Sequence, residues 1–148
     1  MNIQLTSTKA ISIDLEPLDI NSNEKIDNDN LDDETSFSFD FNPLLEGDDG
    51  KTDCFLVAFF GEMKSLKEKY ECRVIYIARF QVDELISIDF LKENFALINA
   101  PAIGYPYFRS FYSNLLLNAG YEPKILPTIN FVKLREDKLN EMRNDFNA

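Results

Sequence analysis

The sequence predicts an α+β fold with one antiparallel sheet of four strands, followed by two main C-terminal helices, in two layers. Two observations carry this prediction. Apolar residues alternate with period two through the first half of the chain, which is typical of strands. After about residue 85 the apolar period becomes helical. The sequence shows no internal repeat and no linker, so residues 1–148 are predicted to form a single domain.

The first two strands come from short alternating segments. Residues 11–15 alternate apolar with polar side chains and predict a strand with one buried face. Residues 19–34 are rich in Asn, Asp and Ser, and they predict an acidic surface loop. Residues 36–41 alternate again and predict the second strand, which a turn at residues 46–50 should end.

The next two strands are predicted to lie in the middle of the sheet. Residues 54–60 are apolar on both faces, as expected for a strand that is covered on both sides. Residues 61–69 are charged and predict a connection. Within residues 70–80 every even position is apolar, while the odd positions are polar at both ends. One face of this strand is therefore expected to be buried and the other partly open.

Two cysteines are too few for a disulfide framework. They lie in these two central strands, and a hairpin that turns near residue 66 would set Cys54 opposite residue 78 and Cys72 opposite residue 60. The two thiols would then not face each other. We expect neither a disulfide nor a redox pair.

The second half of the chain predicts helices. Residues 89–98 fit a short helix, and a long helix follows it with one continuous apolar stripe. The stripe consists of Tyr105, Phe108, Tyr112, Leu115, Leu116 and Ala119. Pro106 suits the first turn of this helix, and Gly120 is the expected stop after it. A last helix is predicted from near Asn130.

Composition and charge exclude several classes of protein. The net charge is -11, and all of the excess lies in residues 1–50, which hold 13 acidic residues and 2 lysines. Nucleic acids and anionic membrane surfaces would need a basic face, which this chain lacks. No apolar stretch reaches the length of a membrane span, and residues 1–15 do not resemble a signal peptide. With two reduced thiols, these features predict a cytoplasmic protein.

No pattern in the sequence predicts catalysis. The chain has no histidine, which excludes a Ser-His-Asp triad and any His-ligated zinc. Residues 27–38 resemble a calcium loop but lack the glycine and the final glutamate that the loop requires. The five glycines are scattered and form no phosphate-binding loop. We therefore expect no enzyme activity, no metal and no cofactor.

Two apolar features each allow two interpretations. Phe37, Phe39 and Phe41 lie on one face of the predicted second strand, where they form either ordinary core or an aromatic binding groove. The long helix is apolar around much of its circumference, so it forms either core alone or core together with a subunit interface.

Residues 100–131 resemble a known family. The helix start Ala100-Pro101-Ala102-Ile103-Gly104-Tyr105-Pro106-Tyr107-Phe108-Arg109, the break Gly120-Tyr121-Glu122-Pro123 and the segment Leu126-Pro127-Thr128-Ile129-Asn130-Phe131 are similar to motifs of the SecB family of protein-export chaperones. Thr8-Lys9-Ala10-Ile11-Ser12-Ile13 is similar to the first strand of that family. The break before Pro127 is one residue tighter than the family pattern.

The resemblance implies a chaperone of the holdase type, without enzyme activity or cofactor. Members of the family hold unfolded or nascent polypeptides in apolar grooves and assemble as a dimer of dimers. The implied client groove consists of Phe37, Phe39, Phe41, Leu139 and Met142. The implied oligomer interface consists of Tyr105, Phe108, Tyr112, Leu115 and Leu116.

One departure from the family concerns docking to the SecA motor. Family members dock through acidic residues on the solvent side of the sheet, a face that carries Asp14, Glu71 and Arg73 in this chain. Ala10 and Arg73 occupy two of the three acidic positions, so a basic SecA tail is expected to bind weakly.

Two other functions stay open at this stage. Some SecB-like proteins serve a single antitoxin of a toxin–antitoxin system, and the sequence does not choose between export and this role. A function of a different class is a monomeric carrier, in which the sheet and the long helix enclose one small apolar ligand. Dye binding at one saturable site in a monomer would favour the carrier.

Overall fold

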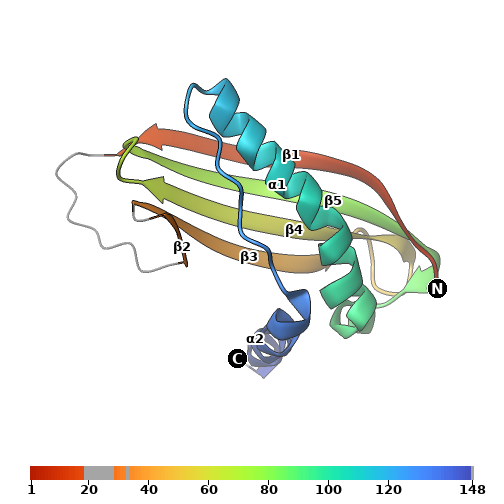
Figure 1. Cartoon of the computed structure of the whole chain (residues 1–148). Helices are drawn as coiled ribbons and strands as arrows, with labels where there is room; N and C mark the ends of the chain where they lie inside the picture. Colours follow the sequence, from red (N-terminus) through yellow and green to blue (C-terminus); the bar gives the residue numbers. More distant parts are fainter. Residues whose placement is uncertain (19–28, 33, 148) are drawn as a thin grey trace.

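The computed structural model describes residues 1–18, 29–32 and 34–147 (Figure 1). Its strands are β1 (Ile3–Pro17), β2 (Asp29–Asp32), β3 (Thr35–Leu45), β4 (Thr52–Ser65) and β5 (Tyr70–Ile86). Its helices are the 3₁₀-helix η1 (Ile88–Lys92), the π-helix η2 (Phe95–Asn99), α1 (Ala100–Asn118) and α2 (Phe131–Asn147). The strands form one antiparallel sheet in the order β1-β5-β4-β3-β2, and α1 crosses one face of it (Figure 1).

The four long strands confirm the predicted sheet, and a short fifth strand is added to it. β2 lies within the segment that was predicted to be only a loop, and it pairs with the beginning of β3. Residues 19–28 and 33 of that predicted loop lie outside the described residues, and with them residues 27, 28 and 33 of the calcium-like segment. The fold class is therefore the predicted one, α+β in two layers, with the helices on one face of the sheet.

The connection between the two central strands is shorter than predicted. β4 continues to Ser65, so residues 61–65 belong to a strand and only residues 66–69 turn the chain. The turn closes with Lys69 in the left-handed region, at φ 60°. Charges at residues 62 and 64 point to the open face of β4, which is why they resemble a loop in the sequence.

The later turn also corrects the predicted register of the cysteines. Cys54 lies opposite Gln81, and Cys72 lies opposite Met63. The prediction that the two thiols do not face each other holds, because they occupy separate rows of the ladder and both are free and buried.

The prediction that the apolar face of the first strand is buried is wrong. Ile11 and Ile13 are each 50% exposed. β1 is the edge strand of the sheet, and its register shifts between Ala10 and Ser12, so Ile11 lies in a bulge. α1 packs near β1 but leaves these two side chains uncovered.

The long helix begins six residues earlier than predicted. The π-helix η2 leads directly into α1, which starts at Ala100 with Pro101 in its first turn. Pro106 therefore lies inside the helix, where its ring nitrogen cannot donate the usual hydrogen bond. The predicted stop is confirmed, because Gly120 has a φ of 94° directly after the last turn.

The last helix begins where the sequence predicts it. The Asn130 side-chain oxygen accepts hydrogen bonds from the backbone N–H groups of Val132 and Lys133, at 3.1 and 3.2 Å. This is the usual arrangement at the N-terminus of a helix, where an Asn satisfies otherwise unpaired donors.

Aromatic rings fill the space between α1 and the sheet. Phe59, Phe108 and Tyr112 are fully buried, and the Phe59 and Phe108 rings stack with centroids 5.7 Å apart. The Tyr112 hydroxyl donates to the Cys72 carbonyl oxygen at 2.5 Å, across from α1 to β5. Burial is the main reason why the pKa of Tyr112 is raised, so the phenol stays neutral and keeps donating.

Gly61 is the position where this packing depends on a missing side chain. A Cβ atom at Gly61 would lie 2.7 Å from Cζ of Phe108 and 2.9 Å from Cε2 of Tyr112, both closer than atoms approach in folded proteins. Gly61→Ala is therefore expected to lower the free energy of unfolding by about 1–3 kcal/mol through overpacking. Urea unfolding measures this loss of stability. Gly50→Ala is not a suitable control, because Gly50 has a φ of 74°, where a side chain is strained whatever the space around it.

A suitable control for Gly61→Ala is Ser38→Ala, because Ser38 lies opposite Glu62 on the open face and is not packed against α1. The control should change stability by less than about 0.5 kcal/mol. Equal stability of Gly61→Ala and the wild-type protein would mean that α1 does not lie this close to β4.

Candidate functional site

The three phenylalanines of β3 form a ladder under the helices. Neighbouring ring centroids lie 6.4 Å apart for Phe37 and Phe39, and 6.3 Å apart for Phe39 and Phe41. Phe37 and Phe41 are buried, whereas Phe39 is half-buried. Of the predicted groove residues on this strand, Phe39 alone keeps appreciable exposed surface. The ring also packs edge-on against Tyr105, at 5.2 Å, and is therefore held in place by α1.

A shallow groove separates β3 from α2. It encloses about 150 Å³ and is lined by Phe39, Asp40, Phe41, Leu134, Asp137, Lys138 and Glu141. The last helix does form the opposite wall, but with Leu134 and Lys138 in place of the predicted Leu139 and Met142. The side chains of Leu139 and Met142 are half-buried and pack against the core instead. Client binding in this groove stays a prediction.

Lys138 fastens α2 to β3. Its side chain is only 4% exposed, and its ammonium lies 2.8 Å from an Asp40 carboxylate oxygen and 2.8 Å from a Glu141 carboxylate oxygen. It also donates to the Asn42 side-chain oxygen at 3.1 Å and lies 5.2 Å from the centre of the Phe41 ring. A buried ammonium needs such partners to offset its loss of hydration. Sequence patterns could not predict this role of Lys138, because its partners Asp40 and Asn42 lie 98 and 96 residues away along the chain.

The predicted oligomer-interface residues belong mainly to the core of the single chain. Tyr105, Phe108, Tyr112 and Leu116 are buried between α1 and the sheet, and Leu115 is half-buried. The Tyr105 hydroxyl donates to the Pro127 carbonyl oxygen at 2.6 Å, and burial raises the pKa of this phenol. The four buried side chains have almost no surface left for a second subunit, so the proposal that they contact one is withdrawn.

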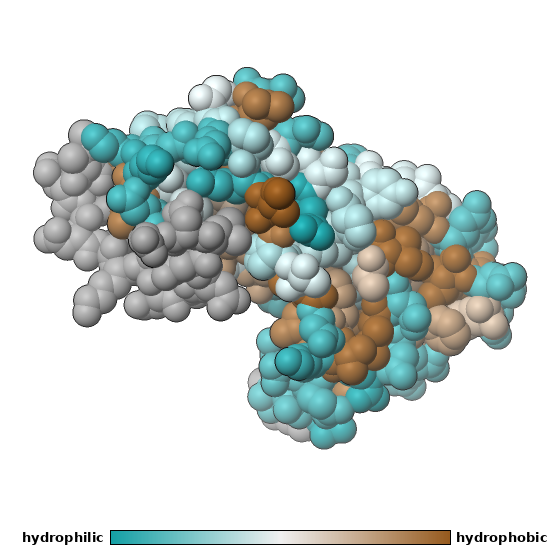
Figure 2. Space-filling model, in the orientation of Figure 1, coloured by the Kyte–Doolittle hydropathy of each residue, from teal (hydrophilic) through white to brown (hydrophobic). Residues whose placement is uncertain are grey.

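The outward side of α1 carries apolar residues that the predicted stripe did not include. Ile103, Tyr107 and Leu117 are all exposed on it, and Arg109 is the only charged residue of this helix. Figure 2 shows hydrophobic residues gathered at the end of the molecule where α1 begins. An exposed helix face without charges is typical of an interaction surface.

The open face of the sheet holds the predicted docking residues together. Asp14 lies opposite Arg73 in the ladder, and the guanidinium also contacts the Glu71 carboxylate. Arg73 is about half exposed there, as predicted. A third carboxylate, that of Glu62, lies 3.8 Å from the guanidinium. This residue was not among the predicted docking residues, because its charged neighbours resemble a loop in the sequence.

These contacts change the expectation for a basic partner. Arg73 is surrounded by three carboxylates, so the local charge on this face is negative and the cation is neutralised. The argument that Arg73 repels a basic tail is therefore weaker than the sequence suggested.

The two thiols lie in surroundings that disfavour the thiolate. Desolvation raises the pKa of Cys72, and desolvation followed by the hydrogen bond to Asp53 raises the pKa of Cys54. Thiols with raised pKa values are weak nucleophiles near neutral pH. Within the described ranges, no three Cys, Asp or Glu side chains are grouped so that they could hold a metal ion. No helix among the described residues is long and apolar enough to cross a membrane.

The sequence of this chain is similar to that of a known protein. No family model matches the chain. It is 29% identical over 100 residues to the protein-export protein SecB of Anaplasma phagocytophilum (strain HZ), a match that covers 65% of this chain and 63% of that protein. The match therefore spans less than two thirds of the relative's length.

Solved structures share the fold. The SecB-like chaperone Rv1957 of Mycobacterium tuberculosis, in complex with a ChAD peptide from the antitoxin HigA1, superposes with a TM-score of 0.61 at 12% identity, over 86% of this chain and 90% of that one. A protein of unknown function from Streptococcus agalactiae superposes with a TM-score of 0.51 at 12% identity, over 87% and 98%.

The antiparallel sheet and the helix that crosses it form the fold that this chain shares with these solved structures. The chain is thus an α+β protein with the fold of the SecB-like chaperone Rv1957. The predicted resemblance is confirmed as a similarity: the chain is similar in sequence to a SecB protein and shares the fold of a SecB-like chaperone.

Proposed function

We propose that this chain is an ATP-independent chaperone that holds unfolded or nascent polypeptides. The observation that carries the proposal is the groove between β3 and α2, where the half-buried Phe39 lies among buried aromatic rings. Apolar burial is non-directional, so such a groove accepts many sequences. Burying one Phe-sized client side chain contributes about 1.5–3 kcal/mol, and several contacts along a surface reach useful affinity after ordering costs.

The client class that we propose is the unfolded precursor of an exported protein. The curated relative is a protein-export SecB, and the open face of this chain carries carboxylates, as a basic docking tail would require. A cytoplasmic location is part of this proposal. The second candidate is an antitoxin, favoured by the antitoxin peptide that is bound to the structural neighbour Rv1957. Identification of the polypeptides that co-purify with this chain discriminates between the two.

The carrier alternative is disfavoured by the packing of the core. A carrier needs an apolar cavity between the sheet and α1, and the fully buried rings of Phe59, Phe108 and Tyr112 fill that space. The groove that remains at β3 and α2 opens at the surface and has a charged rim, which suits an extended chain better than a small ligand.

The assembly is expected to be a symmetric oligomer, a dimer or a dimer of dimers. The proposed interface uses the exposed apolar residues of β1 and α1, among them Ile13, Tyr107 and Leu117. Tyr107→Asp together with Leu117→Asp introduces unpaired charges there and is expected to shift the mass in analytical ultracentrifugation to that of a monomer. The exposed Ile125→Asp is the matched control and should keep the oligomer. A wild-type protein that is monomeric at micromolar concentration contradicts the assembly.

Light scattering by an aggregating, chemically unfolded client tests the proposed function. We expect the chain to suppress the scattering in near-stoichiometric amounts without any nucleotide. Phe39→Ser should abolish the suppression, whereas Ser38→Ala on the opposite face of the same strand should not. A wild-type protein that leaves aggregation unchanged contradicts the function.

A further inference from the structure

The groove between β3 and α2 is small for the client that it is proposed to hold. It encloses about 150 Å³. Sites that bury a small organic molecule usually enclose about 300–1,000 Å³, and an extended client segment of several residues is larger than such a molecule. The two walls of the groove therefore have to separate before a client segment can lie between β3 and α2.

The Lys138 side chain crosses this groove from α2 to β3. Its ammonium donates hydrogen bonds to the side-chain oxygens of Asp40, at 2.8 Å, and Asn42, at 3.1 Å. Both acceptors belong to β3, so these bonds join the two walls. A segment that separates the walls breaks both bonds. The contact of Lys138 with β3 and a bound client thus exclude each other.

The surroundings of Lys138 allow this contact to open. The Asp40 side chain is 57% exposed, so water competes with the ammonium for its carboxylate. The Glu141 carboxylate holds the same ammonium at 2.8 Å, but Glu141 lies on α2, three residues after Lys138. When α2 moves, Glu141 moves with the lysine and keeps its charge paired. Opening therefore costs only the bonds to β3.

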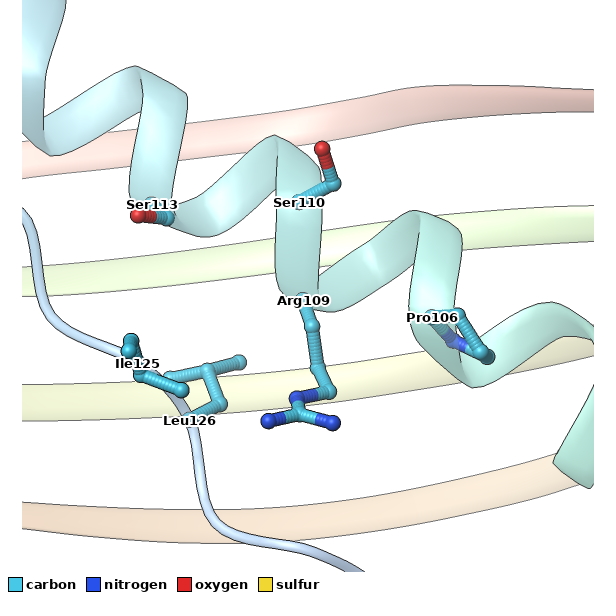
Figure 3. A pocket seen from close by; sticks show the side chains of 6 residues that line it. All are labelled: Pro106, Arg109, Ser110, Ser113, Ile125 and Leu126. Carbon is cyan, nitrogen blue, oxygen red and sulfur yellow. The ribbon is translucent and has the colours of Figure 1, made fainter.

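The beginning of α2 supplies a pivot for this movement. The segment that leads to the helix is held against α1, where Leu126 is buried and lines a hollow together with Arg109 (Figure 3). The Tyr105 hydroxyl donates to the Pro127 carbonyl oxygen of the same segment. Phe131, the first residue of α2, is also buried. The helix is thus anchored at its start, and Lys138 lies about two turns further along.

We propose that Lys138 is a positioning residue that holds α2 closed over the groove, and that a client segment binds only after the bonds of Lys138 to Asp40 and Asn42 are broken. The inference rests on the proposed chaperone function and deepens it, because it names the contact that client binding has to break. A closed form lowers the apparent affinity by the fraction of molecules that are open. If about one tenth of the molecules are open, the affinity is about tenfold lower than that of a protein that is always open.

Peptide binding to Asp40→Asn tests the inference. The chain contains no tryptophan, so the fluorescence of a single Trp in a peptide reports binding directly. The probe is an uncharged peptide of alternating Leu and Ser with one central Trp, blocked at both ends, so that a change in the charge of the protein does not attract or repel it. Asp40→Asn is expected to bind this peptide about tenfold more tightly than the wild-type protein, although the variant is less stable.

Two further variants separate this effect from a general loss of charge. Asp48→Asn removes an exposed carboxylate outside the groove and should bind the peptide as the wild-type protein does. Glu141→Gln also removes a carboxylate 2.8 Å from the ammonium, but it should tighten binding less than Asp40→Asn, because Glu141 does not join α2 to β3. If α2 were only a fixed wall of the groove, loosening it would weaken binding instead.

Nuclear magnetic resonance of the wild-type protein gives a second test that does not depend on the folding of Asp40→Asn. The Lys138 ammonium is held by three side-chain oxygens and should give its own signal in protein labelled with ¹⁵N-lysine. Its absence from Lys138→Arg assigns the signal. Saturation with the Trp peptide is expected to remove the signal from its position in the free protein.

Each contrary outcome overturns the inference in a recognisable way. Equal or weaker binding of the peptide by folded Asp40→Asn means that the contact with β3 does not oppose client binding. An unchanged Lys138 signal in the peptide-saturated wild-type protein means that the groove is occupied while α2 stays closed, and it leaves the proposed function intact. If the wild-type protein binds no peptide and does not suppress client aggregation, the proposed function fails and this inference fails with it.

Discussion

Phe41→Ala is expected to lower the free energy of unfolding by about 3–5 kcal/mol, as large-to-small changes of buried aromatic residues do. Phe41 is 1% exposed, and its ring packs edge-on against Phe131 of α2, with centroids 5.1 Å apart. Removing the ring leaves a cavity where α2 packs against the sheet. Domains of this size are stable by only about 5–15 kcal/mol, so the variant should be partly unfolded or insoluble.

Phe39→Ala on the same strand should behave differently. Because Phe39 is half-buried, its loss is expected to cost about 1–2 kcal/mol, and the variant should keep its fold and its oligomer mass. Its suppression of client aggregation should nevertheless be lost. Urea unfolding and light scattering, measured on both variants, separate a core residue from a groove residue. If Phe39→Ala folds and suppresses aggregation like the wild-type protein, Phe39 does not contact clients.

The second large effect concerns the charges around Lys138. Changing Asp40→Asn together with Glu141→Gln leaves a nearly buried ammonium without a carboxylate partner. The loss is expected to be roughly 3 kcal/mol, because a buried charge without compensation is costly. α2 should then separate from β3, and limited proteolysis within α2 should become faster.

Two controls accompany this double variant. Asp48→Asn with Glu84→Gln removes two exposed carboxylates and changes the net charge equally, so it should leave stability within about 0.5 kcal/mol. Adding Lys138→Met to the double variant removes the orphaned charge but keeps the hydrocarbon stem, and it should restore most of the stability. A double variant as stable as the wild-type protein would show that Lys138 does not fasten α2.

Much of the fold could be predicted because it follows from local patterns. Strict alternation predicts β5, and Gly120 and Asn130 mark helix ends through backbone conformation and capping. The predictions fail where contacts with residues outside the local segment decide whether a residue lies in a strand, a helix or a loop. Residues 61–65 look like a loop because their polar side chains face solvent, yet pairing with β5 makes them strand. Pro106 resembles a helix start, but the preceding π-helix continues into α1.

The candidate site was predictable only in part. The ladder on β3 is visible in the sequence, since Phe37, Phe39 and Phe41 share one face of an alternating segment. Which of the three is exposed depends on where α1 and α2 pack. Helical periodicity likewise identified the buried side of α1 as apolar, but it could not show that the sheet of the same chain would cover that side completely.

Photo-crosslinking tests most directly the claim that clients lie between β3 and α2. A photoreactive amino acid replaces Phe39 in one variant and Ile75, on the open face of the sheet, in the other. Each variant is illuminated with a chemically unfolded client and with the same client in its native state. The account predicts a crosslinked product at position 39 with the unfolded client alone, and little or none at position 75. Strong crosslinking at position 75 with none at position 39 would contradict it.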